Sequence, residues 1–286
     1  MSGPLTIRQL LICIAALLLA ACSRLDLAYR NLDLAIPWWI DSYVSLDDAQ
    51  EEWLEPRLQQ HLAWHCRTQL PNYVDWLTHL RELANHSRLE AKDLREETTK
   101  VRSAIQTIAV EITPSAISLA ESLTPRQLGE LYVSLDEKNV EIRKKYLVGE
   151  PEELIEARSR RMEHRIRDWL GSTSERQSKR IRDWASSQSP YDRAWVENRE
   201  LWQRELRAAL YVHRTPDFAR RLTLLLQQPE AFWTREFREA FEPSEQELAS
   251  LLADLFNAAD STQRYHLRER LSGMISDLRN QSCYPK

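Results

Sequence analysis

Glycine is scarce in this chain of 286 residues, which contains five. Average usage would supply about twenty. So few glycines disfavour the many tight turns of a large β-fold, and no glycine-rich phosphate-binding loop is present. A large excess of either charge is also lacking, because 39 basic and 43 acidic side chains give a formal net charge of −4. This balance excludes a strongly basic nucleic-acid binder.

Long apolar runs are absent after the first two dozen residues, so no later segment is expected to span a membrane. The amino-terminal run, Leu10 to Leu19, follows Arg8 and ends in Ala20-Ala21-Cys22. This order resembles the lipobox of bacterial lipoproteins. The resemblance implies a signal peptide over residues 1–21 and a lipidated segment over 22–45. The alternative is an ordinary secretory signal or an uncleaved anchor.

The lipobox resemblance also implies chemistry and an address. Cys22 would carry a thioether-linked diacylglycerol and a further acyl chain, and these are the only cofactor-like groups expected. Ser23, in place of the Asp that retains lipoproteins at the inner membrane, favours the outer membrane, with the protein facing the periplasm. Residues 46–286 are expected to form a single helical domain, in which two lobes could meet near residue 150.

Cysteine is rare, with four in the chain. Cys13 leaves with the signal peptide and Cys22 is used by the lipid. Cys66 and Cys283 remain in a compartment that is oxidising. We therefore expect a disulfide between them, with two unpaired thiols as the alternative.

Apolar residues recur every three to four positions through most of the remaining chain, which is the period of an amphipathic α-helix. The stripes include Leu54, Leu58 and Leu62; Tyr73, Trp76, Leu77, Leu80 and Leu83; Leu94, Val101, Ile105, Ile108 and Ile112; Trp195, Trp202, Leu206 and Leu210; and Leu248, Leu251, Leu252 and Leu255. The pattern predicts an all-α array of about ten helices with short connections and no significant sheet.

Capping signals mark where these helices should start. In Thr124-Pro125-Arg126-Gln127, threonine can cap, proline fits the first helical position, and glutamine can bond back to the cap. The same cap-x-x-Gln/Glu pattern occurs at Asp47–Gln50, Ser87–Glu90, Ser174–Gln177, Ser244–Glu247 and Asp260–Gln263. Pro151, Pro190 and Pro216 mark further expected starts.

Three groups of residues are candidates for a function, and each has a structural alternative. His61 and His65 are four apart and could face one metal on a helix, but no third ligand is evident, and the favoured alternative is that His65 hydrogen-bonds a neighbouring helix end. Trp38 and Trp39 could contact lipid headgroups or a partner, or could pack on the first helices. Arg158, Arg161 and Arg165 belong to a basic stretch that could meet lipid phosphates or an acidic partner, or could form a solvated face of ion pairs.

Two family resemblances follow from these motifs. The lipobox, Trp39-Ile40-Asp41-Ser42-Tyr43, Trp64-His65 with Leu70-Pro71-Asn72-Tyr73, and Leu123-Thr124-Pro125-Arg126-Gln127 resemble an uncharacterised family of helical lipoproteins from Gram-negative bacteria. The last segment is also similar to the L-T-x-x-Q motif of the periplasmic chaperones typified by Spy and CpxP. Leu46-Asp47-Asp48-Ala49-Gln50 departs from that motif at Asp47.

Catalytic motifs are missing, including the G-x-S-x-G elbow, S-x-x-K and C-x-x-C patterns. We therefore expect a non-enzymatic, lipid-anchored periplasmic protein that binds other envelope proteins, as a chaperone or adaptor. The partners would be the membrane and envelope proteins, not nucleic acid. The alternatives are a metal-dependent envelope hydrolase that uses His61 and His65, and a purely structural outer-membrane lipoprotein.

Overall fold

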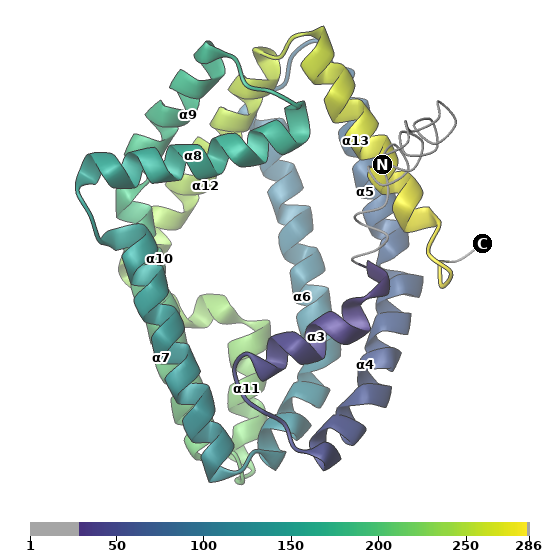
Figure 1. Ribbon diagram of the computed structural model, residues 1–286, viewed down its shortest axis with the longest axis vertical. Coiled ribbons are helices and arrows are strands. Elements are labelled where there is room, and N and C mark those ends of the chain that lie inside the picture. Colours follow the sequence, from purple (N-terminus) through teal and green to yellow (C-terminus); the bar gives the residue numbers. More distant parts are fainter. Residues whose placement is uncertain (1–28, 285–286) are drawn as a thin grey trace, which may run out of the picture.

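The computed structural model describes residues 29–284 of the chain (Figure 1). Within them it contains 11 α-helices and no strand, and 84% of the residues are helical. The all-α prediction of about ten helices is therefore confirmed. The predicted signal peptide and Cys22 lie outside the described residues, and the expected lobes meeting near residue 150 stay a prediction.

The helices keep the labels of Figure 1. In chain order they are α3 (Leu32–Asp41), α4 (Asp48–Thr68), α5 (Leu70–Leu83), α6 (Ala91–Ser122), α7 (Pro125–Leu147), α8 (Pro151–Leu170), α9 (Glu175–Ser187), α10 (Ser189–Tyr211), α11 (Asp217–Gln227), the short 3₁₀ helix η1 (Pro229–Phe232), α12 (Arg235–Asn257) and α13 (Ser261–Arg279).

The helices follow the outline of an elongated frame (Figure 1). Helices α7 and α10 pack together along one long side, and α4, α5 and α13 form the other. Helices α8 and α9 pack against each other at one end, while α3 crosses near the opposite end. Helix α6, with 32 residues, runs between the sides and packs on α4, α11 and α12.

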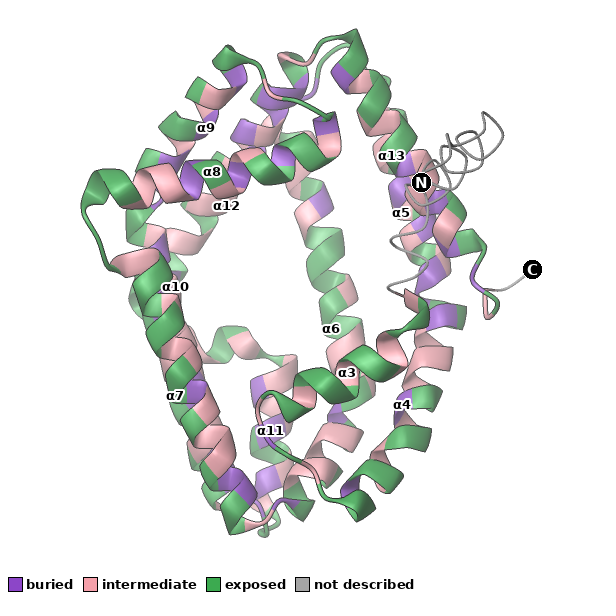
Figure 2. Ribbon diagram, viewed as in Figure 1, coloured by how far each residue is buried: buried purple, intermediate pink, exposed green. Residues whose placement is uncertain are grey.

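The buried apolar side chains form three clusters instead of one continuous core. The first joins α5 to α13, the second joins the ends of α6 and α7 to α10 and α11, and the third joins α8 and α9 to α12. Figure 2 shows exposed residues prevailing along the middle of α6. There the apolar stripe predicted from the sequence is largely in water, because Val101, Ile105 and Ile112 are exposed. A long helix that packs mainly near its ends explains the difference.

Capping boxes predicted at four positions are present. The side chains of Asp47, Thr124, Ser174 and Asp260 each accept a hydrogen bond from the backbone N–H three residues later. Two other predicted starts are wrong. Glu90, not Ser87, caps α6. Ser244 lies inside α12, which Thr234 caps, because edge-on and tilted contacts among the rings of Trp233, Phe237 and Phe241 hold the turns before Pro243 in the helix.

The glutamines of these boxes also meet in pairs, far apart in sequence. Gln50 of α4 and Gln127 of α7 donate to each other's side-chain oxygen over 3.2 and 2.6 Å. Gln177 of α9 and Gln263 of α13 do the same over 3.2 and 2.9 Å. All four are buried. Because an amide both donates and accepts, each pair satisfies itself without water.

The two pairs reveal that the chain repeats one scheme. In each half a capped helix leads through a kink into a second helix, and two more helices follow. The first half consists of α4, α5, α6 and α7. The second consists of α9, α10, α12 and α13, with α11 and η1 inserted between α10 and α12. The halves interlock, since α5 packs on α13 and α10 packs on α7. Helix α3 precedes the first half as α8 precedes the second.

The kinks share a sequence that supports this correspondence. The first is Thr68-Gln69-Leu70-Pro71 and the second is Ser187-Gln188-Ser189-Pro190. In both, the buried glutamine donates 3.0 Å to the hydroxyl of the preceding residue. Proline follows near the start of the next helix, where its missing N–H costs no helical hydrogen bond. A tryptophan lies seven positions after each glutamine, Trp76 and Trp195.

Candidate functional site

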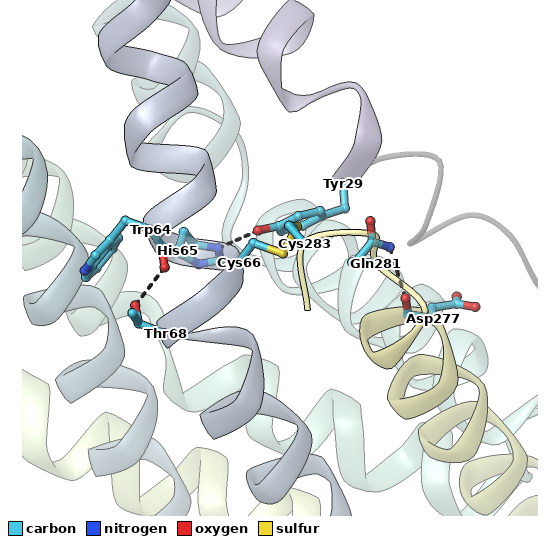
Figure 3. The surroundings of a disulfide bond; sticks show 8 residues. All are labelled: Tyr29, Trp64, His65, Cys66, Thr68, Asp277, Gln281 and Cys283. Carbon is cyan, nitrogen blue, oxygen red and sulfur yellow. Dashed lines mark hydrogen bonds between the residues drawn. A yellow bond between two sulfur atoms is a disulfide. The ribbon is translucent and has the colours of Figure 1, made fainter. Parts of the chain in front are cut away.

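The predicted disulfide is present. Cys66, near the end of α4, is bonded to Cys283 in the carboxy-terminal tail, with their Cα atoms 5.9 Å apart (Figure 3). Cys66 is fully buried in the first cluster. The bond fixes the tail that follows α13 to the residue three positions before the first kink. Within the described residues, no helix is both long and apolar enough to cross a bilayer.

His65 lies beside this disulfide, and both of its ring nitrogens lie within hydrogen-bond distance of tyrosine hydroxyls. Its Nδ1 lies 2.9 Å from the Tyr29 hydroxyl, and its Nε2 lies 3.2 Å from the Tyr73 hydroxyl. Burial lowers the pKa of His65 and raises the pKa of Tyr29 to about 12. Tyr29 thereby fixes the start of the described chain to α4, as the labelled residues of Figure 3 show. His65 therefore has a hydrogen-bonding role, but its partners are two tyrosine hydroxyls and not the backbone of a helix end.

His61 faces helix α6 and not His65's partners. Its Nδ1 lies 3.1 Å from Glu111 Oε1 and its Nε2 lies 2.8 Å from Ser115 Oγ. The two histidines are thus directed to different groups. Among residues 29–284 no three His, Cys, Asp or Glu side chains gather as metal ligands.

The serine, histidine and carboxylate do, however, have the order of a nucleophile, a base and an orienting acid. Ser115 lies inside α6, where backbone N–H groups bond along the helix. Such N–H groups cannot serve as the free donors that stabilise an oxyanion. The arrangement can move a proton between Ser115 and His61 and ties α4 to α6.

Trp38 and Trp39 of α3 are in water. Their exposed fractions are 75% and 59%, and that of Leu34 on the same helix is 68%. The structural alternative, that these tryptophans pack on the first helices, is therefore wrong. Ile40 and Val44 make the contact with the second cluster instead. Trp39 and Tyr43 form an edge-on ring pair, with 5.2 Å between ring centres.

Arg158 differs from the rest of the basic stretch because it is buried. It donates from Nε and Nη2 to Asp192 of α10, over 2.9 and 2.5 Å, and from Nη1 to the carbonyl of Ala185, over 2.5 Å. Burial raises the pKa of Asp192, while the Arg158 guanidinium opposes that rise. The pair joins α8 to the second kink, so its role is to lock the helices.

Arg161 and Arg165 continue the same face of α8 and line a cavity of about 340 Å³ between α8, α9, α10 and α12. Arg161 lies over the ring of Tyr146, 4.9 Å from its centre. The other walls include Trp184, Tyr191 and Phe241, with Gln188, Ser244 and Glu245. Sequence reasoning missed these residues, although the repeated Ser/Thr-Gln-x-Pro kink would have singled out the region around Gln188.

Most other basic residues of the stretch form the solvated face of ion pairs that was the structural alternative. Arg160 pairs with Glu156 over 2.8 Å, and Lys179 pairs with Asp183 over 2.9 Å. Arg167 pairs with Glu163 over 3.3 Å. Exposed pairs of this kind contribute little to stability. The structure thus divides the stretch into an outer face and an inner face that points into the cavity.

The described chain is an all-α protein of two similar, interlocked halves. The chain belongs to DUF6279, a family of unknown function, whose pattern matches residues 42–238. The match includes both kinks and the arginine-lined cavity's walls on α8, α9 and α10. It agrees with the expected membership of an uncharacterised family and shows no similarity to Spy or CpxP. No curated protein and no solved structure matches the chain.

Proposed function

We propose that this protein is a lipid-anchored factor of the bacterial envelope that binds another envelope protein through the exposed face of α3. The observation that carries the proposal is the exposure of Leu34, Trp38 and Trp39. Neighbouring exposed apolar side chains can mark an interaction site, and tryptophan is enriched in the parts of interfaces that contribute most to binding.

The position of α3 supports an interface close to the membrane. Leu32 lies ten positions after Cys22, and ten residues span at most roughly 35 Å. Helix α3 is also fixed to the body of the protein, because Val44 is buried in the second cluster and Lys138 of α7 lies 4.5 Å from the ring centre of Tyr43. A partner that covers α3 would therefore be held at a defined distance from the lipid.

Exposed apolar residues also occur on other helices, which favours a protein over lipid headgroups as the occupant. Val101, Ile105 and Val110 of α6 and Val133 and Val140 of α7 are all exposed. Contact with lipid would account for the exposed residues of α3 but not for those of α6 and α7. The disulfide adds support for an oxidising compartment, since such bonds are rare where thiols are kept reduced.

Photocrosslinking in intact cells tests the proposal. A photoreactive amino acid at position 38 should give adducts with a specific envelope protein, whereas the same group at Lys144, an exposed position on α7, should not. The double variant Trp38→Ala, Trp39→Ala should lose the partner in pull-downs while keeping its helical circular dichroism. Adducts with lipid or with the protein itself alone would replace the proposal with a structural role at the membrane.

Hydrolysis is a second candidate, because His61 lies between Glu111 and Ser115 at 3.1 and 2.8 Å. A fluorophosphonate probe decides it. Labelling of the full-length protein that is lost in Ser115→Ala would establish a reactive serine. We expect no labelling, since α6 offers no free backbone donors beside Ser115 to stabilise an oxyanion.

A further inference from the structure

In the first half, the side chain four residues before the kink has all of its hydrogen-bond partners. That position is His65, and both of its ring nitrogens have partners. One partner, Tyr29, comes from outside the half, and its ring lies 5.9 Å from that of His65 in a stacked arrangement. An aromatic ring and an oxygen atom from another part of the chain thus fill the space beside the first kink.

The second half has Trp184 at the corresponding position, and there the space is open. The Trp184 Nε1–H is buried and has no hydrogen-bond partner among the described residues. The cavity of about 340 Å³ borders this tryptophan. A buried donor without an acceptor is destabilising, and most buried polar groups in proteins are hydrogen-bonded. An acceptor atom from a ligand would supply the missing partner.

The charges around the cavity specify what that ligand should be. Three guanidinium groups and two carboxylates line it. Arg158 is matched by Asp192 at 2.5 Å, and Glu245 is matched by Arg102 of α6 at 2.6 Å. Arg161 and Arg165 form no ion pair within residues 29–284, although Arg161 lies near enough to Asp192 to oppose the rise in the pKa of that carboxyl. Once both carboxylates are matched, the guanidinium groups of Arg161 and Arg165 are left for a ligand, which must therefore be an anion. The aromatic side chains that line the same cavity favour a carboxylate attached to a ring over a bare phosphate.

We propose that this cavity binds a small aromatic carboxylate. Its oxygen atoms accept hydrogen bonds from Arg161, Arg165 and Trp184 Nε1, and its ring packs among Tyr146, Tyr191 and Phe241. The volume is at the lower end of the range of small-molecule sites, which is about 300–1,000 Å³. Guanidinium groups match a carboxylate with paired hydrogen bonds. A free aromatic acid and the carboxy-terminal aromatic residue of a polypeptide share this chemistry. The site goes beyond the protein-binding surface of α3 and does not depend on it.

Calorimetry with the oxidised full-length protein in detergent tests the site directly. The probes are 3-phenylpropionate, its uncharged amide, inorganic phosphate, and a hexapeptide ending in phenylalanine as the free acid or the amide. We expect at least one of the two acids to bind about tenfold or more tightly than its amide, and phosphate not to compete. Binding of the free acid alone points to a small metabolite, and binding of the peptide acid alone points to a polypeptide end.

Variants on one helix provide the matched control. Arg161→Gln and Arg165→Gln should each weaken the acid by about tenfold, whereas Arg160→Gln, on the outer face of α8, should leave it unchanged. Trp184→Phe keeps a ring but removes the donor and should weaken binding by about threefold to tenfold. If either glutamine variant loses helical circular dichroism, Arg161→Lys and Arg165→Lys replace it.

The proposal is overturned if neither acid binds at concentrations up to about 1 mM. It is equally overturned if the amides bind as tightly as the acids, or if phosphate competes with them. An equal loss in Arg160→Gln would also overturn it, because the effect would then come from general charge. None of these outcomes bears on the α3 interface, whose crosslinking test uses a different surface.

Discussion

The two halves of the molecule solve the same packing problem by different chemistry. Both contain a helix that kinks at a buried glutamine, but three positions earlier the first half has Cys66 and the second has Ala185. A disulfide locks the first kink. A buried arginine that reaches the Ala185 carbonyl and Asp192 locks the second. The covalent lock leaves no polar group to satisfy, whereas the ionic lock brings cationic side chains and a cavity with it.

Removal of the disulfide should have the largest effect on this comparison. The bond closes a loop with a sequence separation of 217, and a loop of that size restricts the unfolded chain by roughly 5 kcal/mol. Cys66→Ala with Cys283→Ala should therefore lower the free energy of unfolding by about that amount in a urea titration. Addition of a reductant should change the wild-type midpoint but not that of the variant. Equal midpoints for wild type and variant would contradict the prediction.

Breaking the ionic lock should have the next largest effect. Arg158→Met leaves Asp192 buried without its partner, and such a loss costs about 3–5 kcal/mol. Arg158→Met combined with Asp192→Leu should recover most of the loss, because no charge is then left in the interior. Urea titrations of the two variants measure this. A double variant no more stable than the single one would show that the pair does more than neutralise itself.

The paired glutamines should respond alike in the two halves. Gln127→Leu and Gln263→Leu each remove one amide, so that the partner glutamine loses the bonds between the two side chains and a loop carbonyl loses its donor. The expected loss is about 1–3 kcal/mol in each case. In the first half, Gln50→Leu with Gln127→Leu should cost less than the sum of the two single changes. A large loss in one half only would mean that the two glutamine pairs contribute unequally to stability, although their geometry is the same.

Acidification should have the smallest effect on the comparison, since His65 in the first half titrates and Trp184 at the corresponding position of the second half does not. Burial lowers the pKa of His65. The unfolded chain therefore takes up this proton more readily, and the stability contributed at neutral pH is lost as the pH falls below about 6.5. His65→Phe should reduce the decline in unfolding free energy between about pH 7.5 and 5.5. An unchanged decline would assign it to the other histidines.

The sequence predicts those features that depend on neighbouring residues. Thr124, Pro125 and Gln127 lie within one turn, so their capping box could be read directly. The disulfide could be predicted because the expected signal peptide and lipid anchor leave two cysteines for a compartment that is expected to be oxidising. The pairing of Gln50 with Gln127 could not, since it joins positions 77 residues apart.

The candidate site depends on packing that a helical period does not encode. Arg158, Arg161 and Arg165 stood out as a basic face, yet only the placement of α10 beside α8 buries Arg158 and leaves the other two at a cavity. The same limit explains α6. An apolar stripe shows that a helix has an apolar face, but not that another element covers it, and Ile105 is 61% exposed.

The disulfide also decides how the molecule would carry a mechanical load. The chain from Cys66 to Cys283 is a closed covalent loop, and the segment that leads from the amino terminus through Tyr29 joins it near that closure. Tension applied between this segment and any point within the loop divides between two arms, because the chain leads back to the closure in both directions. The single pair of sulfur atoms therefore determines whether the second arm of the loop shares the load.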